Sequence, residues 1–365
     1  MKRVFVLLMV ALLVLAGGTA SGQVPVSRYT EASELTLVGK LFNDTPNPYH
    51  RVDTSRFGGL TRRENTLVRM SSGIACAFRT NSTAITITTI YREPTFPVNG
   101  NGISTRGYDL YIRENGKWLY AASAVNPDSR LEEELTLISG MQGGRNYDCL
   151  LYLPLYSELE SVKIGIEENA TIEPLENPFR HRIAVFGSSF THGSSTSRAG
   201  MSYPAQLSRN TGLQMLSLGV SGNCLLQDSF CDILCAAPDI DAFVFDAFSN
   251  PSAPTMEKRL FPFIEKLQAA HPGVPLVFQR TIWREQRNFN AVKDAAEKKK
   301  MHMADSLMAI AVKKYKNVYY ITPNATSKAH DTSVDGIHPG DHGYTLWADS
   351  IRRPLTRILR KYGIR

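Results

Sequence analysis

The sequence predicts an α/β protein in two parts: an antiparallel β-sandwich of the jelly-roll kind, then a parallel sheet covered by helices on both faces. Three observations support this prediction. Short alternating strands continue to about residue 168, the rhythm changes near residue 175, and strands then alternate with helices. The length of 365 residues fits about two domains of ~150 residues each. With 43% hydrophobic and 21% charged residues, and only 26 Gly and 19 Pro, the chain is neither disordered nor collagen-like.

Residues 1–22 are typical of a secretory signal peptide. Lys2 and Arg3 precede an apolar run over residues 4–16, and small residues follow as far as Gly22. The run is shorter than the ~20 residues that span a bilayer, so cleavage is favoured over an uncleaved membrane anchor. We therefore expect an exported protein, periplasmic or extracellular, with no stable membrane insertion.

The charge balance gives little support for a nucleic-acid partner. The chain has 41 Lys and Arg against 34 Asp and Glu, and the signal segment accounts for two of the basic residues. The remaining excess lacks the concentrated basic stripe that nucleic acid requires. The basic residues of the last helix are interpreted as a solvated face.

Residues 23–176 are expected to form the sandwich. In 84–90 and 162–167, residues with apolar or β-branched side chains alternate with others at period two, which is typical of strands with one buried face. Turn signals at 99–102, 114–116 and 143–144 separate such runs.

Residues 177–365 are expected to form the parallel sheet and its helices. The predicted strands are 183–186, 214–218, 242–245, 274–278 and 318–321. The predicted helices are 202–210, 225–236, 255–270, 290–315 and 344–362. Right-handed crossovers bring the carboxyl ends of parallel strands to one edge, which is where active sites of such sheets lie.

The five cysteines do not define a disulfide framework. An odd number leaves at least one thiol free, and a Cys76–Cys149 bridge is possible without being predictable. Cys231 and Cys235 are four residues apart in a predicted helix, where they are interpreted as small buried hydrophobes. No CxxC pair is present, which argues against a structural zinc site.

Polar residues and glycines that could carry chemistry occur at the predicted strand ends. Ser189 follows the first strand of the parallel sheet, Gly222 the second and Asn250 the third. Asp335 and His338 lie in the loop before the last helix, where a histidine and an aspartate can supply a base and its orienting partner. Each residue alone could be a turn former or a helix cap. Their joint occurrence at strand ends and in the terminal loop favours an active site.

The order Gly-x-Ser, Ser-Gly-Asn, Asn and Asp-x-x-His over residues 181–365 resembles the SGNH (GDSL-like) hydrolase superfamily. Residues 107–111, which read GYDLY, resemble the G-x-D-L-Y motif of the sandwich domain that precedes some bacterial SGNH hydrolases. The resemblance implies a three-layer α/β/α, flavodoxin-like catalytic domain. Two blocks depart from the family pattern: Ser188 stands where an acid is usual, and Phe248 and Pro251 replace a glycine and an acid. Phe248 therefore puts the shape of the acyl pocket in question.

The resemblance also implies residue roles. Ser189 would be the nucleophile, His338 its base and Asp335 the residue that orients His338. The oxyanion donors would be the Ser189 and Gly222 backbone N–H groups and the Asn250 side-chain amide. This mechanism requires no metal and no organic cofactor.

Other roles remain open in the sequence. Arg280, Thr281 and Trp283 follow the fourth strand and could line the substrate cleft. Asp335, His338, Asp341 and His342 crowd one loop and could bind a divalent ion, which is the less favoured alternative. His192 and His302 are interpreted as incidental polar residues.

The favoured function is an exported serine esterase that removes short acyl groups, acetyl first, from a carbohydrate or a similar ester. The alternative from another class is a catalytically silent carbohydrate-binding protein on an SGNH scaffold, suggested by Ser188, Phe248 and Pro251. A lipase acting on long chains would need an exposed apolar lid, and no such segment is evident. The sequence leaves the sugar, the acyl length and the oligomeric state open.

Overall fold

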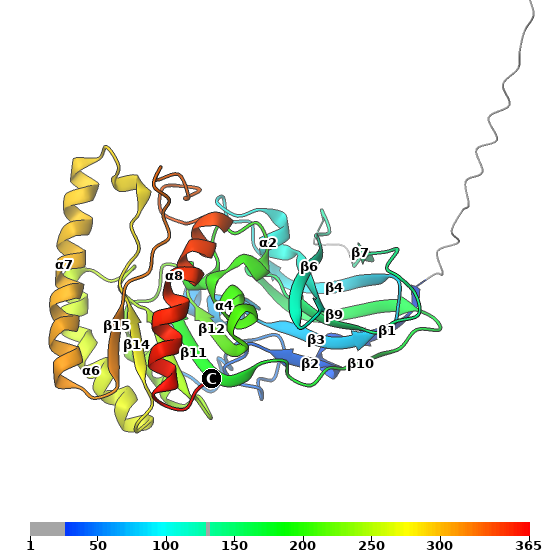
Figure 1. Cartoon of the computed structure of the whole chain (residues 1–365), viewed down its shortest axis with the longest axis horizontal. Helices are drawn as coiled ribbons and strands as arrows, with labels where there is room; N and C mark the ends of the chain where they lie inside the picture. The colour runs from blue at the N-terminus through cyan, green and yellow to red at the C-terminus, as the bar shows by residue number, and fades with distance from the viewer. Residues whose placement is uncertain (1–25, 129–131) are drawn as a thin grey trace, which may run out of the picture.

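The computed structural model describes residues 26–128 and 132–365, which form a strand-rich part and an α/β part (Figure 1). The predicted signal peptide, residues 1–22, lies outside these ranges, so its cleavage stays a prediction. Within the described ranges, no helix has both the length and the apolar composition needed to cross a membrane.

The N-terminal part contains two antiparallel sheets. One has the strand order β1-β9-β4-β7, and the other has the order β10-β3-β8-β5-β6, with β2 beside β3. The strands are β1 (Val26–Glu31), β2 (Thr36–Val38), β3 (Ala75–Thr80), β4 (Ile85–Pro94), β5 (Tyr108–Glu114), β6 (Lys117–Ala124), β7 (Leu135–Ile138), β8 (Tyr147–Tyr152), β9 (Ser157–Glu167) and β10 (Ile172–Pro174). Ile85 and Ile164 of the first sheet and Phe78, Leu110 and Leu151 of the second share one buried cluster. The two sheets therefore form a sandwich.

Two α-helices in this part were not predicted. Helix α1 (Arg62–Arg69) begins with a capping box, in which Thr61 and Glu64 each bind the other's backbone N–H. Helix α2 (Gly102–Arg106) is capped by the side chain of Asn101. The sequence had suggested a turn at residues 99–102, at the start of α2, and no particular element over α1.

The C-terminal part contains one five-stranded parallel sheet with the order β12-β11-β13-β14-β15. Its strands are β11 (Arg180–Gly187), β12 (Leu213–Gly219), β13 (Ala242–Asp246), β14 (Leu276–Gln279) and β15 (Val318–Ile321). This order, with the second strand outside the first, is the flavodoxin-like order. The predicted fold class, with antiparallel sheets followed by a parallel sheet in an α/β part, is confirmed.

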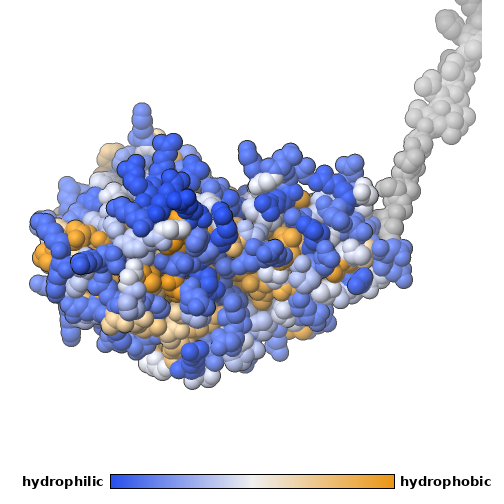
Figure 2. Space-filling view, turned by 60° about the horizontal axis from the view of Figure 1, so that its bottom comes forward, coloured by the Kyte–Doolittle hydropathy of each residue, from blue (hydrophilic) through white to orange (hydrophobic). Residues whose placement is uncertain are grey.

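Helices cover both faces of the parallel sheet, which makes three layers (Figure 1). Helices α4 (Tyr203–Thr211) and α8 (Asp341–Arg360) pack on one face, and α5 (Asp228–Cys235), α6 (Ala253–Ala270) and α7 (Ala291–Lys314) pack on the other. All seven residues of β12 and all five of β13 are buried, as expected for strands covered on both sides. Apolar residues form small separate patches on the largely hydrophilic face shown in Figure 2.

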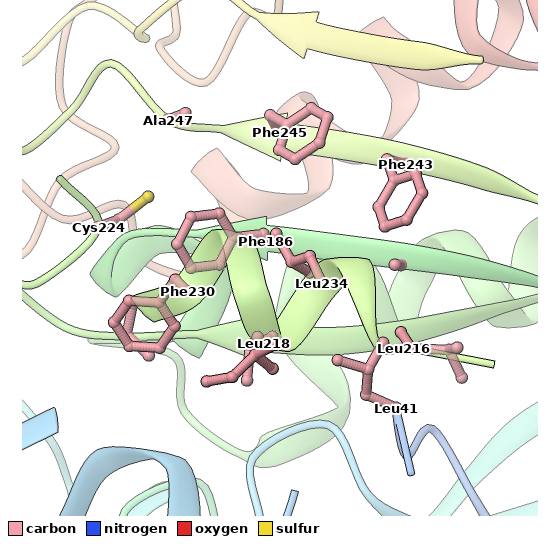
Figure 3. Close-up of a cluster of buried hydrophobic side chains, with 14 of the residues drawn as sticks. Leu41, Phe186, Leu216, Leu218, Cys224, Phe230, Leu234, Phe243, Phe245 and Ala247 are labelled. Carbon is pink, nitrogen blue, oxygen red and sulfur yellow. The ribbon is translucent and has the colours of Figure 1, made fainter. Parts of the chain in front are cut away.

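A single hydrophobic cluster continues from the N-terminal part into the C-terminal part. Leu41 belongs to the same cluster as Leu216 and Leu218 of β12 (Figure 3). Arg51 is fully buried beside it, and its guanidinium donates to the carbonyls of Leu67, Met70, Ser217 and Gly219. These contacts tie α1 and the preceding segment to the end of β12.

All five cysteines are free thiols in the structure. Cys76 and Cys149 lie in strands, as expected, and both are buried without a bridge. Cys231 is fully buried in α5, which matches its interpretation as a small hydrophobe, and Cys235 is half-buried.

Candidate active site

Ser189 lies at the carboxyl end of β11, in the position that the strand-end rule predicts. It is the first residue of the short helix α3 (Ser189–His192), and the side chain of Ser188 caps that helix. Helix α3 packs very closely on β12, because a Cβ on Gly219 would lie 2.1 Å from the backbone nitrogen of His192. The glycine therefore allows α3 to lie against the sheet, which places Ser189 at its edge.

The structure joins Ser189, His338 and Asp335 by hydrogen bonds. Ser189 Oγ lies 2.8 Å from His338 Nε2, and His338 Nδ1 lies 2.7 Å from Asp335 Oδ2. Asp335 Oδ1 also accepts the backbone N–H groups of Ile337 and His338, at 2.9 and 2.7 Å. Partial burial alone would raise the pKa of Asp335, but the hydrogen bonds from His338 and Ile337 lower it to about 2. The carboxylate is thus ionised at neutral pH and aligned with the imidazole.

Gly222 and Asn250 line the same cavity as Ser189 and His338, and the cavity has a volume of about 490 Å³. Gly222 has a φ of 74°, a left-handed conformation that glycine adopts without strain. Asn250 Oδ1 accepts the Cys224 N–H at 3.3 Å, and within the described residues the Asn250 amide nitrogen donates no hydrogen bond. Both predicted oxyanion donors are therefore close to the serine.

The two departures from the family pattern have local explanations. Ser188 Oγ donates to Asp246 Oδ2 at 2.6 Å, and Ser249 Oγ donates to Asp246 Oδ1 at 2.7 Å. Asp246 is buried at the end of β13, and this burial raises its pKa. An acid at position 188 would meet this carboxylate, whereas serine donates to it. Phe248 is buried against Phe278, with ring centroids 5.9 Å apart, and does not line the cavity.

The N-terminal part supplies side chains to the cavity that the sequence analysis did not identify. Asn99 Nδ2 donates to Asp335 Oδ2 at 3.0 Å and lies 3.2 Å from His338 Nδ1. Arg63, Pro97 and Tyr156 line the cavity as well. The turn signal at residues 99–102 was the available clue, but it indicated a loop and no contact with the distant Asp335.

The residues predicted to line the cleft after β14 lie elsewhere. Arg280 binds Asp305 through paired hydrogen bonds, Thr281 is buried, and Trp283 Nε1 donates to Asn288. None of the three lines the cavity. Two other residues line the cavity: Arg284, just after Trp283, and Lys300 of α7. Both donate to the Ser249 carbonyl.

The four residues expected in one loop are divided in the structure: Asp335 and His338 lie before α8, whereas Asp341 and His342 are its first two residues. Asp341 accepts the backbone N–H and the hydroxyl of Ser197, while His342 is exposed. Among residues 26–128 and 132–365, the His, Cys, Asp and Glu side chains form no group of three or more that could hold a metal ion.

His192 has a structural environment that differs from the incidental role expected for it. Its ring stacks on Tyr156 at 4.1 Å, its Nε2 lies 2.7 Å from the Leu155 carbonyl, and burial lowers its pKa well below its usual value. His192 is thus part of the contact between the two parts. His302 is exposed on α7, consistent with its interpretation as an incidental residue.

The GYDLY motif also lies at the contact between the two parts. Asp109 is fully buried and accepts from Arg198 Nη1 at 2.9 Å and from the Gly200 N–H at 2.8 Å. Arg198 and Gly200 precede α4 in the C-terminal part, in and beside the 3₁₀ turn η2 (Ala199–Met201). The motif therefore joins the sandwich to the segment that follows α3.

The fold and the two halves of the sequence define the class of this protein. The model of the GDSL-like Lipase/Acylhydrolase family matches residues 180–356, and a second family model, the N-terminus of Esterase_SGNH_hydro-type, matches residues 27–172. A GDSL-like lipase from Bacteroides ovatus ATCC 8483 is 35% identical, with a TM-score of 0.86 over 92% of this chain and 98% of that one. The chain belongs to the GDSL-like lipase/acylhydrolase family and is an esterase of the SGNH type.

More distant solved structures share the fold. A salicylyl-acyltransferase from a tetracycline biosynthetic pathway has a TM-score of 0.66 at 18% identity, covering 93% of this chain and 99% of that one. A family two carbohydrate esterase from Cellvibrio japonicus has a TM-score of 0.57 at 14% identity, covering 92% of this chain and 99% of that one. No curated protein sequence matches the chain.

Proposed function

We propose that this esterase is an exported enzyme that removes short acyl groups, acetyl first, from a carbohydrate through an acyl-enzyme on Ser189. The observation that carries the proposal is the continuous hydrogen-bond chain from Ser189 through His338 to Asp335. A serine hydroxyl is a poor nucleophile at neutral pH unless a base is in contact with it, and His338 is in contact.

In the first step, Ser189 Oγ attacks the carbonyl carbon of the ester while its proton passes to His338 Nε2. Asp335 holds the imidazole through Nδ1 and stabilises the cation that forms. The negative charge on the carbonyl oxygen is met by the Ser189 and Gly222 backbone N–H groups and by the Asn250 amide. One such donor contributes about 3 kcal/mol to lowering the barrier.

The tetrahedral intermediate then breaks its bond to the alcohol, which leaves with the proton from His338. A water molecule gives a proton to His338 and attacks the acyl-enzyme, which releases the carboxylic acid and restores Ser189. The overall reaction consumes one ester and one water and produces one acid and one alcohol.

Two features support a small acyl group on a sugar. Hydroxyl, amide and cationic side chains contribute much of the cavity lining, which suits a polyhydroxylated substrate better than a long alkyl chain. Carbohydrate esterases share the fold, which places carbohydrate esters among the substrates to test first.

The first experiment measures acetate release from p-nitrophenyl acetate by the wild type and by Ser189→Ala. We expect the substitution to reduce kcat by at least about 10³-fold because the nucleophile is lost. Ser229→Ala, on α5 and outside the cavity, is the matched control and should retain activity. Full activity in a folded Ser189→Ala protein would contradict the assignment.

If the folded wild type releases no acetate from acetylated xylan and hydrolyses no p-nitrophenyl ester from acetate to octanoate, the serine esterase proposal fails. Glycan binding without turnover would then identify a silent binding protein. A series of p-nitrophenyl esters from acetate to octanoate tests the acyl length, and kcat/KM should be highest for acetate.

Export is tested on the full chain expressed in a bacterial host. Sequencing the N-terminus of protein from the periplasmic or extracellular fraction should show a start near residue 23. Intact residues 1–22 on an intracellular product would contradict export.

A further inference from the structure

A second cavity of about 630 Å³ lies beside the active-site cavity. Its lining residues are Arg62, Arg63, Thr66, Leu67, Met70, Thr95, Phe96, Pro97 and Tyr156. Arg63, Pro97 and Tyr156 line both cavities, so the two form one groove that continues away from Ser189. The extension is made entirely by the N-terminal part.

The walls of this groove carry positive charge. Arg62 and Arg63 line the extension, and Arg284 and Lys300 line the active-site cavity. No carboxylate is among the residues that line either cavity. Within the described residues, Arg62 and Arg63 are exposed and make no side-chain hydrogen bond or ion pair.

Nearby acids make their contacts with other groups. Glu64 accepts the Thr61 backbone N–H at 2.7 Å and the Gln227 amide at 2.7 Å. Glu297 pairs with Arg284 at 2.8 Å. Among the residues that the structure describes, Arg62 and Arg63 therefore lie at the groove without an ion-pair partner.

The position of these arginines in the helix is unfavourable for the helix itself. They are the first two residues of α1, where the positive end of the helix dipole disfavours cations. Two arginines in a destabilising position, beside an active site, indicate a function that offsets the cost. An anion in the groove would be attracted by both side chains and by the helix end.

Lys300 of α7, in the C-terminal part, gives independent support for an anionic ligand. Burial, together with the charge of Arg284, lowers the pKa of Lys300 to about 8. Glu297 and Asp246 raise this pKa, but burial and Arg284 outweigh them, so an anionic substrate group in the cavity would stabilise the ammonium further.

We propose that the groove binds an anionic group that the substrate carries beyond the reacting ester, so that the substrate is an acylated anionic polysaccharide. The charged group is a carboxylate or a sulfate, since both match the guanidinium fork. The inference rests on the esterase function proposed above and specifies its substrate class.

The test compares pairs of polymers that differ only in charge. Chemically acetylated polygalacturonate is compared with its methyl ester, and acetylated dextran sulfate with acetylated dextran. Acetate release by the wild type should give a kcat/KM at least about tenfold higher for one charged polymer than for its neutral partner. Raising sodium chloride from 50 to 500 mM should remove most of that preference, because exposed charges are screened.

Arg62→Gln with Arg63→Gln should lower the ratio of charged to neutral kcat/KM toward one. The control pair Arg352→Gln with Arg353→Gln removes the same charge from α8, beside a different cavity, and should leave the ratio unchanged. A preference retained in the first double variant, or equal rates on charged and neutral polymers by the wild type, would overturn the inference.

Binding separates this inference from the esterase proposal. Calorimetry with galacturonate oligosaccharides on Ser189→Ala should show salt-sensitive binding that Arg62→Gln with Arg63→Gln weakens at least about tenfold. If this binding is observed but the wild type hydrolyses no ester, the esterase proposal is rejected and the anion-binding groove is retained. Ester hydrolysis without any preference for charge would keep the enzyme and reject the groove.

Discussion

Asn99 connects the N-terminal part to the reacting groups. Its amide donates to the oxygen of Asp335 that also binds the His338 ring. Its own carbonyl accepts the Ser195 hydroxyl at 2.9 Å, so the side chain is anchored at its base. Asn99 therefore acts as a positioning residue, because it contacts Asp335 and His338 and reaches Ser189 only through them.

We predict that Asn99→Ala lowers kcat for p-nitrophenyl acetate about tenfold while KM changes little. A hydrogen bond to a charged group contributes about 1.5–3 kcal/mol. Losing it should raise the activation free energy by part of this amount. Steady-state rates measure both kinetic constants.

Asn210→Ala, on α4 and outside the site, is the control and should match the wild type. An Asn99→Ala protein with the wild-type kcat would show that the contact is only structural.

At the scale of elements, the loop before α8 is held by one carboxylate. Glu285, in the 3₁₀ turn η3 (Glu285–Arg287), accepts the backbone N–H groups of Thr332 and Ser333 at 3.0 and 2.7 Å, and it accepts the hydroxyls of both residues as well. These bonds fix the segment that leads into Asp335. Partial burial would raise the pKa of Glu285, but these hydrogen bonds lower it to about 2.

This carboxylate makes part of the stability depend on pH. Because the folded pKa lies below the usual 4.5, the contribution is complete above about pH 4.5 and is lost as the pH falls toward 2. We predict that Glu285→Gln lowers the free energy of unfolding by roughly 3 kcal/mol at pH 7. Urea unfolding of both proteins at pH 7, 4 and 3 should show the difference shrinking at acid pH. A difference that is constant across this range would contradict the role of ionised Glu285.

The strands and helices of the parallel sheet were predicted well because their signals are local. The bounds of β15 agree with the prediction, while β14 begins two residues later than expected. Helix α1 was missed although its Thr61-Arg-Arg-Glu64 capping box is visible in the sequence. Ser189, Gly222 and Asn250 could be placed because strand ends meet at one edge. Asn99 could not, because its partner is 236 residues away and no periodicity connects them.

At the scale of the whole molecule, the two parts share one core. The cluster that contains Leu41 and Leu216 crosses the boundary expected at residue 176, and buried Arg51 bonds to carbonyls on both sides of it. The expected division at residue 176 follows the change from antiparallel to parallel strands. The shared core indicates that the two parts do not unfold separately. Calorimetry should show a single transition, and two resolved transitions would contradict a shared core.

The ion pair between buried Asp109 and partly exposed Arg198 should help the two parts to unfold together. We predict that Asp109→Ala lowers the free energy of unfolding by about 1–3 kcal/mol, because partly exposed Arg198 and the Gly200 N–H lose a buried acceptor. Adding Arg198→Ala should recover part of the loss, which a double-mutant cycle in urea measures. Strictly additive effects would show that the pair is not coupled. Arg79→Ala, which removes a more exposed partner of Asp148, is the control and should cost much less than Asp109→Ala.

The wide spacing of the site residues along the chain also affects when activity can arise. Asn99 and Ser189 emerge from the ribosome long before Asp335 and His338, which lie much further along the chain. The N-terminal strands can begin to fold during synthesis. The base and its partner join them only after synthesis has passed residue 338. A chain that crosses a membrane unfolded would therefore carry no esterase activity during its passage and would acquire it at its destination.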